Sequence, residues 1–170
     1  MRVLVCACAA IALSACQSVP EEGARATAQL LPTEGSKTFG EATFEQVGTK
    51  VRVTAFVQGL KPGQEHGLHI HEVGDCGDHA KNAKGHFNPF DKPHGSPTSR
   101  ERHAGDLPSL AANEQGRAKV QADVDLITLH PGRGNIVGRS LMVHAGPDDF
   151  TSQPSGNSGD RIACGVIREG

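Results

Sequence analysis

Apolar residues alternate with mostly polar ones in the segment 49–57, where Val51, Val53, Ala55 and Val57 occupy every second position. A period of two is typical of a β-strand that buries one face. The sequence G-L-K-P-G at 59–63 follows at once and predicts a turn. We therefore expect a half-buried strand over 49–57 that ends at this turn.

Further short segments carry strand character at 67–73, 118–124, 140–144 and 162–167. The chain has 21 Gly and 10 Pro among its 170 residues, which favours many turns over long helices. Short strands separated by Gly and Pro turns predict an all-β sandwich or barrel. A length of 170 residues suits one domain with a single core.

The segment 74–108 has no strand pattern and contains several Pro and Gly. A loop of this length inside a compact domain is usually functional or disordered. Its histidines, His79, His86, His94 and His103, favour a functional role.

The N-terminus has the pattern of an export signal. Arg2 precedes an apolar run from Val3 to Leu13, which is too short to span a bilayer and suits a secretory signal. The run ends in L-S-A-C at 13–16, which resembles a bacterial lipobox with Cys16 as the lipidated residue. Ordinary secretory cleavage, with Cys16 incidental, is the alternative. The expected protein is periplasmic and anchored to a membrane through lipid at its N-terminus, and Gln17 favours the outer membrane by analogy with lipoprotein sorting.

Three regions follow from this interpretation: a lipoprotein signal peptide at 1–15, a lipidated N-terminus and tether at 16–35, and a folded domain at 36–170. The tether prediction rests on the lack of a sustained period, together with Pro and Gly, in 17–35. The net charge of −2 gives no indication of nucleic-acid binding.

The cysteines follow the same division. Cys6 and Cys8 leave with the signal and Cys16 carries lipid, so Cys76 and Cys164 remain in the domain. Disulfides persist in exported proteins, and we expect this pair to form one. Two buried free thiols are the alternative.

His69 and His71 are two residues apart in the strand that begins near Gly67. Such side chains project to the same face of a strand, which places Ile70 on the opposite, core face. Two neutral imidazoles side by side are good ligands for zinc or copper. An exposed strand face is the alternative interpretation of this pair.

The long loop adds further ligand types: His86, His94, His103 and Asp106. Three histidines and one aspartate would complete a tetrahedral zinc site. A bound zinc would also order a long polar loop, because metal binding supplies folding free energy. His144 offers another imidazole at the end of an apolar strand.

Six motifs in order carry a resemblance to a known family. They are G-L-H-I-H, G-H-F-N-P, K-P-H-G, E-R-H-A-G-D-L, G-R-S-L-M-V-H and D-R-I-A-C-G-V-I, and they run from about Phe39 to Arg168. The sequence resembles the copper,zinc superoxide dismutases of the exported bacterial kind. The resemblance implies an eight-stranded Greek-key β-barrel.

The resemblance also implies the cofactors, one copper and one zinc per subunit, and the residues that act. Copper would be held by His69, His71, His86 and His144, and zinc by His86, His94, His103 and Asp106. Asp148 would link a copper ligand to a zinc ligand, Cys76 and Cys164 would form the disulfide, and Arg161 would attract the anionic substrate. His86 would bridge the two metals and take up a proton, while copper cycles between Cu(II) and Cu(I) to convert superoxide to oxygen and hydrogen peroxide.

Some positions stand apart from this pattern. The segment 145–160 has no Lys or Arg, so we expect Lys81 and Lys84 to supply charge that steers the substrate; a solvated loop is the alternative. His66, His79 and His130 match no ligand position and are interpreted as surface residues.

The alternative functions are a non-catalytic periplasmic copper- and zinc-binding protein on the same fold and a zinc-stabilised structural lipoprotein. The resemblance is compatible with a monomer or a homodimer.

Overall fold

The computed structural model describes residues 23–170. The predicted signal peptide at 1–15, Cys16 and Gln17 lie outside the described residues. Within the described range there is one 3-10 turn, η1 (Lys81–Ala83), and every other regular element is a β-strand. None of the helical structure in this range is long and apolar enough to cross a membrane.

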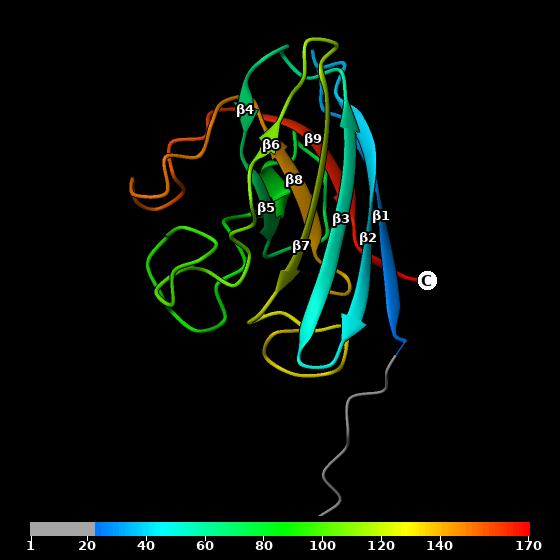
Figure 1. Cartoon of the computed structure of the whole chain (residues 1–170), viewed down its shortest axis with the longest axis vertical. Helices are drawn as coiled ribbons and strands as arrows, with labels where there is room; N and C mark the ends of the chain where they lie inside the picture. The colour runs from blue at the N-terminus through cyan, green and yellow to red at the C-terminus, as the bar shows by residue number, and fades with distance from the viewer. Residues whose placement is uncertain (1–22) are drawn as a thin grey trace, which may run out of the picture.

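Eight strands form one antiparallel sheet that curls around the core (Figure 1). Its strands follow the order β5-β8-β9-β1-β2-β3-β7, and β10 also pairs with β1. The bounds are β1 (Arg25–Pro32), β2 (Phe39–Val47), β3 (Lys50–Gln58), β5 (Leu68–His71), β7 (Arg117–Val124), β8 (Ser140–His144), β9 (Arg161–Val166) and β10 (Arg168–Glu169). A separate pair consists of β4 (Glu65–His66) and β6 (Leu110–Ala111). The predicted all-β fold, an eight-stranded Greek-key β-barrel, is confirmed as a curled sheet whose end strands, β5 and β7, do not pair with each other.

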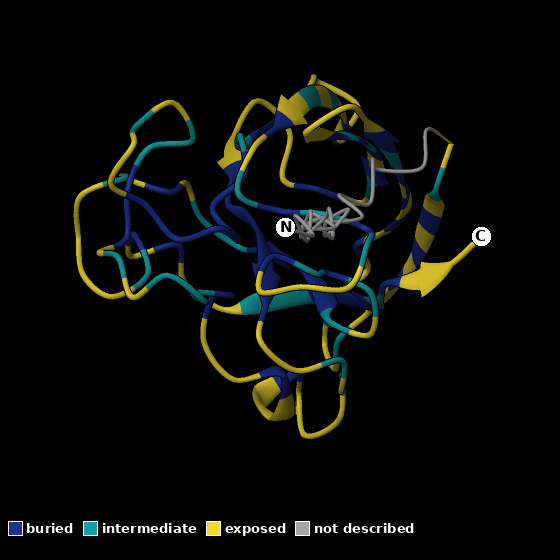
Figure 2. Ribbon diagram, turned by 90° about the horizontal axis from the view of Figure 1, so that it is seen from below, coloured by how far each residue is buried: buried dark blue, intermediate teal, exposed yellow. Residues whose placement is uncertain are grey.

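Alternating burial in β1, β2 and β3 builds one side of the core. Ala28 pairs with Ala42, and Ala42 pairs with Ala55, and all three side chains point inward. Phe44 and Val53 face each other in the same way. The outward residues of these strands are mostly exposed, so buried and exposed residues alternate along the ribbons in Figure 2.

The prediction of a tether up to residue 35 was wrong for Arg25–Pro32, which form β1. Ala26, Ala28 and Leu30 are buried, so the strand does alternate. Its signal is weak because two of the three inward side chains are alanines, which carry little hydrophobic contrast. β2 was not predicted either, because its inward positions include Gly40 and Gln46, which break the apolar alternation.

β5 and β8 differ from the other strands because every residue in them is buried. One face, with Leu68, Ile70 and Leu141, belongs to the main core. The other face is covered by the loops that follow β5 and β8, which lie on the same side of the sheet in Figure 1. The polar residues on this second face, including His69, His71 and His144, are therefore held away from water.

Gly105 allows the long loop to lie against β5. The backbone N–H of Ile70 donates to the carbonyl of Gly105, and the N–H of Gly105 donates to the carbonyl of Phe87, both over 2.9 Å. A Cβ at Gly105 would lie 2.3 Å from the carbonyl oxygen of Ile70. Only glycine permits this approach, which brings the segments that carry His86 and Asp106 beside His69 and His71.

Candidate metal centre

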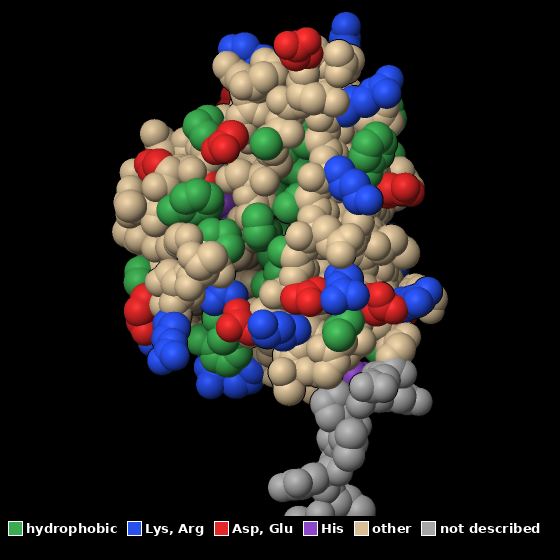
Figure 3. Space-filling model, viewed as in Figure 1, with side chains coloured by type: hydrophobic (Ala, Val, Ile, Leu, Met, Phe, Trp, Pro, Cys, Tyr) green, Lys and Arg blue, Asp and Glu red, His purple; other side chains and the backbone are tan. Residues whose placement is uncertain are grey.

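Two groups of buried side chains meet behind β5 and share one histidine. The ligand atoms within each group lie within 4.8 Å of one another. All seven residues are at most 8% exposed, and little histidine reaches the face drawn in Figure 3. The first group is His69, His71, His86 and His144, and the second is His86, His94, His103 and Asp106.

In the first group, two rings are oriented by backbone carbonyls. The Nδ1–H of His71 donates to the carbonyl of Lys84 over 2.9 Å, and the Nδ1–H of His144 donates to the carbonyl of Gly159 over 3.1 Å. Each neutral ring then keeps a lone pair on Nε2. These two Nε2 atoms lie 3.4 Å apart, and two lone pairs cannot share a hydrogen bond. A cation between them would satisfy both.

The other two rings of this group complete the set of lone pairs. The Nε2–H of His69 donates to Oδ2 of Asp148 over 2.6 Å, which leaves Nδ1 of His69 buried without a partner. Nε2 of His86 is also buried without a partner. Buried polar atoms are normally hydrogen-bonded because desolvation is costly. Four convergent imidazole lone pairs fit copper in both ligand type and number.

The second group surrounds a single carboxylate oxygen. Oδ1 of Asp106 lies 2.9 Å from Nδ1 of His86, 3.0 Å from Nδ1 of His94 and 3.3 Å from Nδ1 of His103. Oδ2 of Asp106 is engaged separately, since it accepts the backbone N–H groups of Gly95 and His103. Three imidazole nitrogens and one carboxylate oxygen are a donor set typical of tetrahedral zinc.

Asp148 connects the two groups. Its Oδ2 accepts from His69 and its Oδ1 accepts from Nε2 of His94 over 2.9 Å. Both rings are thereby held with their Nδ1 lone pairs toward the metal positions, the orientation that a carboxylate beside a metal ligand provides. The structure thus places Asp148 between a residue of each group.

Gly156 makes room for the side chains of Asp148 and His94, a role that the sequence analysis did not predict. A Cβ at this position would lie 1.9 Å from Oδ1 of Asp148 and 2.5 Å from Nε2 of His94. Its φ of +67° also favours glycine. The only sequence signal was a glycine in a Ser- and Gly-rich loop, which does not indicate what lies beside it.

Burial, reinforced by neighbouring imidazoles, lowers the pKa of His71 to about 2, of His144 to about 3 and of His86 to about 4, so these three rings of the first group stay neutral. Burial alone would raise the pKa of Asp106, but hydrogen bonds from its three histidines hold that pKa well below its usual range. Neutral imidazole and ionised carboxylate are the forms that bind metal.

The metal-free protein should lose stability as the pH falls from 6.5 toward 4. In this window the unfolded chain protonates His71, His86 and His144, whose folded pKa values are about 2, 4 and 3, while the folded chain does not. Each such histidine lowers the free energy of unfolding by up to about 1.4 kcal/mol per pH unit. His94 has the opposite effect, because hydrogen bonds to Asp106 and Asp148 outweigh burial and raise its pKa to about 9. The free energy of unfolding should therefore also fall as the pH rises from 6.5 to 9.

Urea unfolding of chelator-treated protein at pH 5, 6.5 and 9 measures this dependence. We expect the highest stability near pH 6.5. A free energy of unfolding that stays constant between pH 6.5 and pH 5 would contradict the burial of neutral histidines.

A pocket of about 510 Å³ opens beside the first group. Its lining includes His86, His144, Arg161, Lys81 and Lys84. The guanidinium of Arg161 is half-buried and donates to the carbonyls of Ala80 and Lys84, so its charge has a fixed place. Three cationic side chains thus surround a pocket that reaches two imidazoles of the first group.

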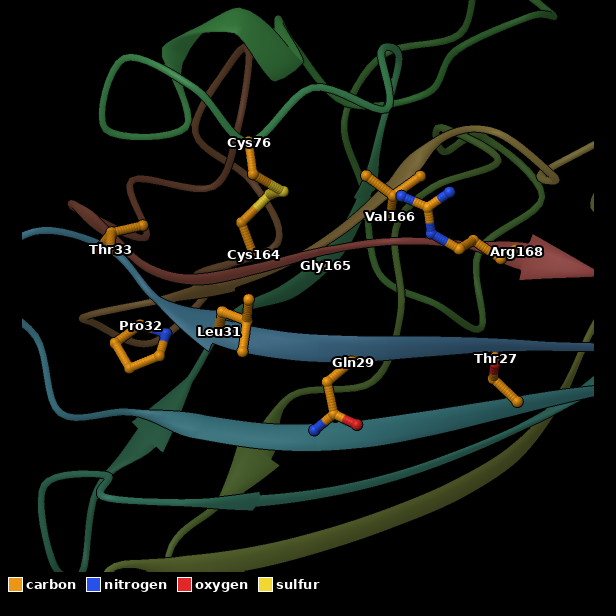
Figure 4. A pocket seen from close by; sticks show the side chains of 10 residues that line it. All are labelled: Thr27, Gln29, Leu31, Pro32, Thr33, Cys76, Cys164, Gly165, Val166 and Arg168. Carbon is orange, nitrogen blue, oxygen red and sulfur yellow. A yellow bond between two sulfur atoms is a disulfide. The ribbon is translucent and has the colours of Figure 1, made fainter.

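The disulfide between Cys76 and Cys164 is present, as predicted, with a Cα–Cα distance of 5.8 Å. It joins the loop after β5 to β9, the strand that begins at Arg161 (Figure 4). The bridge closes a separation of 88 residues. It therefore anchors the loop that carries Lys81 and Lys84 to the strand that carries Arg161.

The three remaining histidines behave differently from one another. The surface prediction was wrong for His66, which is 1% exposed and whose Nδ1–H donates to the carbonyl of His144 over 2.9 Å. His79 is exposed, as predicted, and lies 3.4 Å from a carboxylate oxygen of Glu34. His130 is partly buried, with Nε2 shielded from solvent.

Comparison with known proteins agrees with this arrangement. A family model described as copper/zinc superoxide dismutase matches residues 38–167. "Superoxide dismutase [Cu-Zn] 2" of Aquifex aeolicus is 42% identical over 149 residues, which cover 85% of this chain and 86% of the relative. "Extracellular superoxide dismutase [Cu-Zn]" of Haemonchus contortus is 40% identical over 138 residues, covering 78% of this chain and 74% of the relative.

Among solved structures, a double mutant of a SOD-like protein from Bacillus subtilis superposes with a TM-score of 0.76 at 34% identity. The match covers 84% of this chain and 96% of the other. The chain belongs to the copper/zinc superoxide dismutase family.

Proposed function

We propose that this protein converts superoxide to oxygen and hydrogen peroxide. The observation that carries the proposal is the convergence of four imidazole lone pairs beside a cationic pocket that two of these histidines, His86 and His144, line. Copper held there by His69, His71, His86 and His144 would supply one-electron chemistry by alternating between Cu(II) and Cu(I). Zinc held by His86, His94, His103 and Asp106 has no redox chemistry and would order the long loop.

His86 is suited to proton transfer. Its Nδ1 faces Asp106 at 2.9 Å, while its Nε2 lacks a partner and belongs to the group beside the pocket. We assign Nε2 of His86 to hold a proton and deliver it to the peroxide product, with the second proton coming from solvent. Asp106 and its backbone donors keep the ring in place during this exchange.

Arg161, Lys81 and Lys84 are assigned to substrate attraction. Superoxide is an anion, and a pocket lined by fixed positive charge raises the rate at which anions arrive. The loop 145–160 on the other side of the pocket contributes no Lys or Arg. The charge around the pocket therefore depends on these three residues.

We expect Arg161→Ala to lower the dismutation rate about tenfold. Lys81→Ala and Lys84→Ala should have smaller effects but should make the rate less sensitive to ionic strength, because salt screens charge–substrate attraction. The measurement is the rate constant for superoxide decay from low to high salt, with Lys61→Ala, an exposed lysine absent from the pocket lining, as the control. A salt slope unchanged in both pocket variants would contradict steering by these lysines.

A non-catalytic copper- and zinc-binding protein is the second candidate function. Such a protein has no need for a fixed guanidinium beside its copper ligands, and here Arg161 is held by two carbonyls at the pocket. Copper and zinc analysis together with a superoxide-scavenging assay separates the two candidates. We expect one copper, one zinc and activity; full zinc with no copper uptake and no activity would defeat the enzymatic proposal.

We further infer that the protein works outside the cytoplasm as an N-terminally lipidated protein, with the outer membrane as its location. The Cys76–Cys164 disulfide supports export, because disulfides persist in oxidising compartments. The extracellular relative from Haemonchus contortus also supports it. The lipobox-like end of the N-terminal apolar run supports lipid attachment at Cys16.

A Cys16→Ser variant tests this inference. We expect the wild-type chain to incorporate labelled fatty acid and to fractionate with membranes, because two or more acyl chains anchor a protein stably. The variant should lose both properties. Equal membrane association of the two forms would contradict lipidation at Cys16.

A further inference from the structure

Lys84 has an unusual backbone conformation for a lysine. Its φ of 65° and ψ of −147° fall in a region that glycine occupies and that a side chain strongly disfavours. Gly85 follows it outside the left-handed region, and a Cβ there would meet nothing within 4 Å. The chain thus carries lysine where the backbone favours glycine, and glycine where a Cβ would meet open space.

The surroundings of Lys84 explain how this conformation is held. Its carbonyl accepts hydrogen bonds from Nδ1–H of His71 and from the guanidinium of Arg161. Its own N–H donates to the carbonyl of Lys81 over 3.1 Å, and the next carbonyl, that of Gly85, accepts from the N–H of Glu72 over 2.9 Å. One carbonyl therefore orients both an imidazole of the first group and the fixed positive charge of the pocket.

The charge on the Lys84 side chain gives a reason why this position carries lysine and not glycine. It is exposed and belongs to the lining of the 510 Å³ pocket, together with His144 and Arg161. Glycine at 84 would preserve the carbonyl and relieve the strain, but it would remove this charge. Backbone strain of this kind persists at functional sites when neighbouring contacts over-determine it.

We propose that Lys84 is a substrate-guiding residue that the fold holds in a glycine-favoured conformation at a cost in stability. This inference rests on the proposed superoxide chemistry for the role of the side chain. Its structural part, the strain at Lys84, is independent of that chemistry. Because both parts act at one residue, mutation of Lys84 to glycine should raise stability and lower the rate.

The test compares Lys84→Gly with Lys84→Ala in the copper- and zinc-loaded protein. Both variants remove the same charge, and only the glycine variant relieves the strain. We expect Lys84→Gly to raise Tm by about 2–6 °C relative to Lys84→Ala. Both should lower the rate constant for superoxide decay about two- to fivefold at low ionic strength, and both should retain one copper and one zinc.

A double variant, Lys84→Gly with Gly85→Lys, moves the charge by one residue without restoring the strain. It should keep the higher Tm and recover part of the lost rate. Equal Tm values for the glycine and alanine variants would show that Lys84 is not strained. Wild-type rates in both variants would show that Lys84 does not guide the substrate. If the wild-type protein had no superoxide activity, the proposed function would fail while the Tm comparison still reported on the strain.

Discussion

Replacing His144 by alanine is expected to reduce superoxide decay to the uncatalysed rate while zinc stays bound. His144 belongs only to the first group, where its Nε2 lies 3.4 Å from Nε2 of His71. Its removal leaves three imidazoles at the copper position, and the second group keeps all four of its ligand atoms. Metal analysis and a superoxide-decay assay on the same preparation measure both consequences.

His79→Ala is the matched control, because His79 is an exposed histidine outside both groups. It should keep normal activity and both metals. Loss of zinc from His144→Ala, or retention of full activity, would contradict the division of the centre into two groups.

Removing the disulfide should cause a large loss of stability. The Cys76–Cys164 bridge closes 88 residues, and a loop of this length is worth about 4.6 kcal/mol in the chain-entropy model. We expect Cys76→Ser/Cys164→Ser to lower the free energy of unfolding by about this amount. Activity should fall too, because the bridge joins the loop of Lys84 to the strand of Arg161.

Denaturant unfolding with and without reductant checks this prediction. Reductant should destabilise the wild-type protein and leave the double-serine variant unchanged. A loss below about 1 kcal/mol would show that contacts other than the disulfide hold the loop to β9.

The strand that the sequence predicts most clearly has large apolar side chains at almost every second position. This strand is β3, in which Val51, Val53 and Val57 all face the core. β1 and β2 use alanine and glycine for much of the same task, because neighbouring strands approach closely there. A Cβ at Gly40, for example, would lie 2.2 Å from the carbonyl oxygen of Phe56. This close approach of two strands arises only in the assembled sheet, so the sequence of either strand alone does not indicate it.

The histidines of the centre were predictable in part. The spacing of His69 and His71 on a strand indicates a shared face, and family resemblance indicates the other ligands. The groups that orient the rings were not predictable, because several are backbone carbonyls, such as those of Lys84 and Gly159. His66 was misjudged for the same reason, since its partner is the carbonyl of His144.

The central claim is that one copper in the first group, beside zinc in the second, makes this chain a catalyst of superoxide dismutation. Copper titration of the zinc-loaded protein, with superoxide decay followed after each addition, tests it most directly. The decay rate should rise linearly and level off at one copper per chain. A zinc-loaded protein that stays inactive at one equivalent of copper, or whose rate keeps rising well beyond it, would contradict the claim.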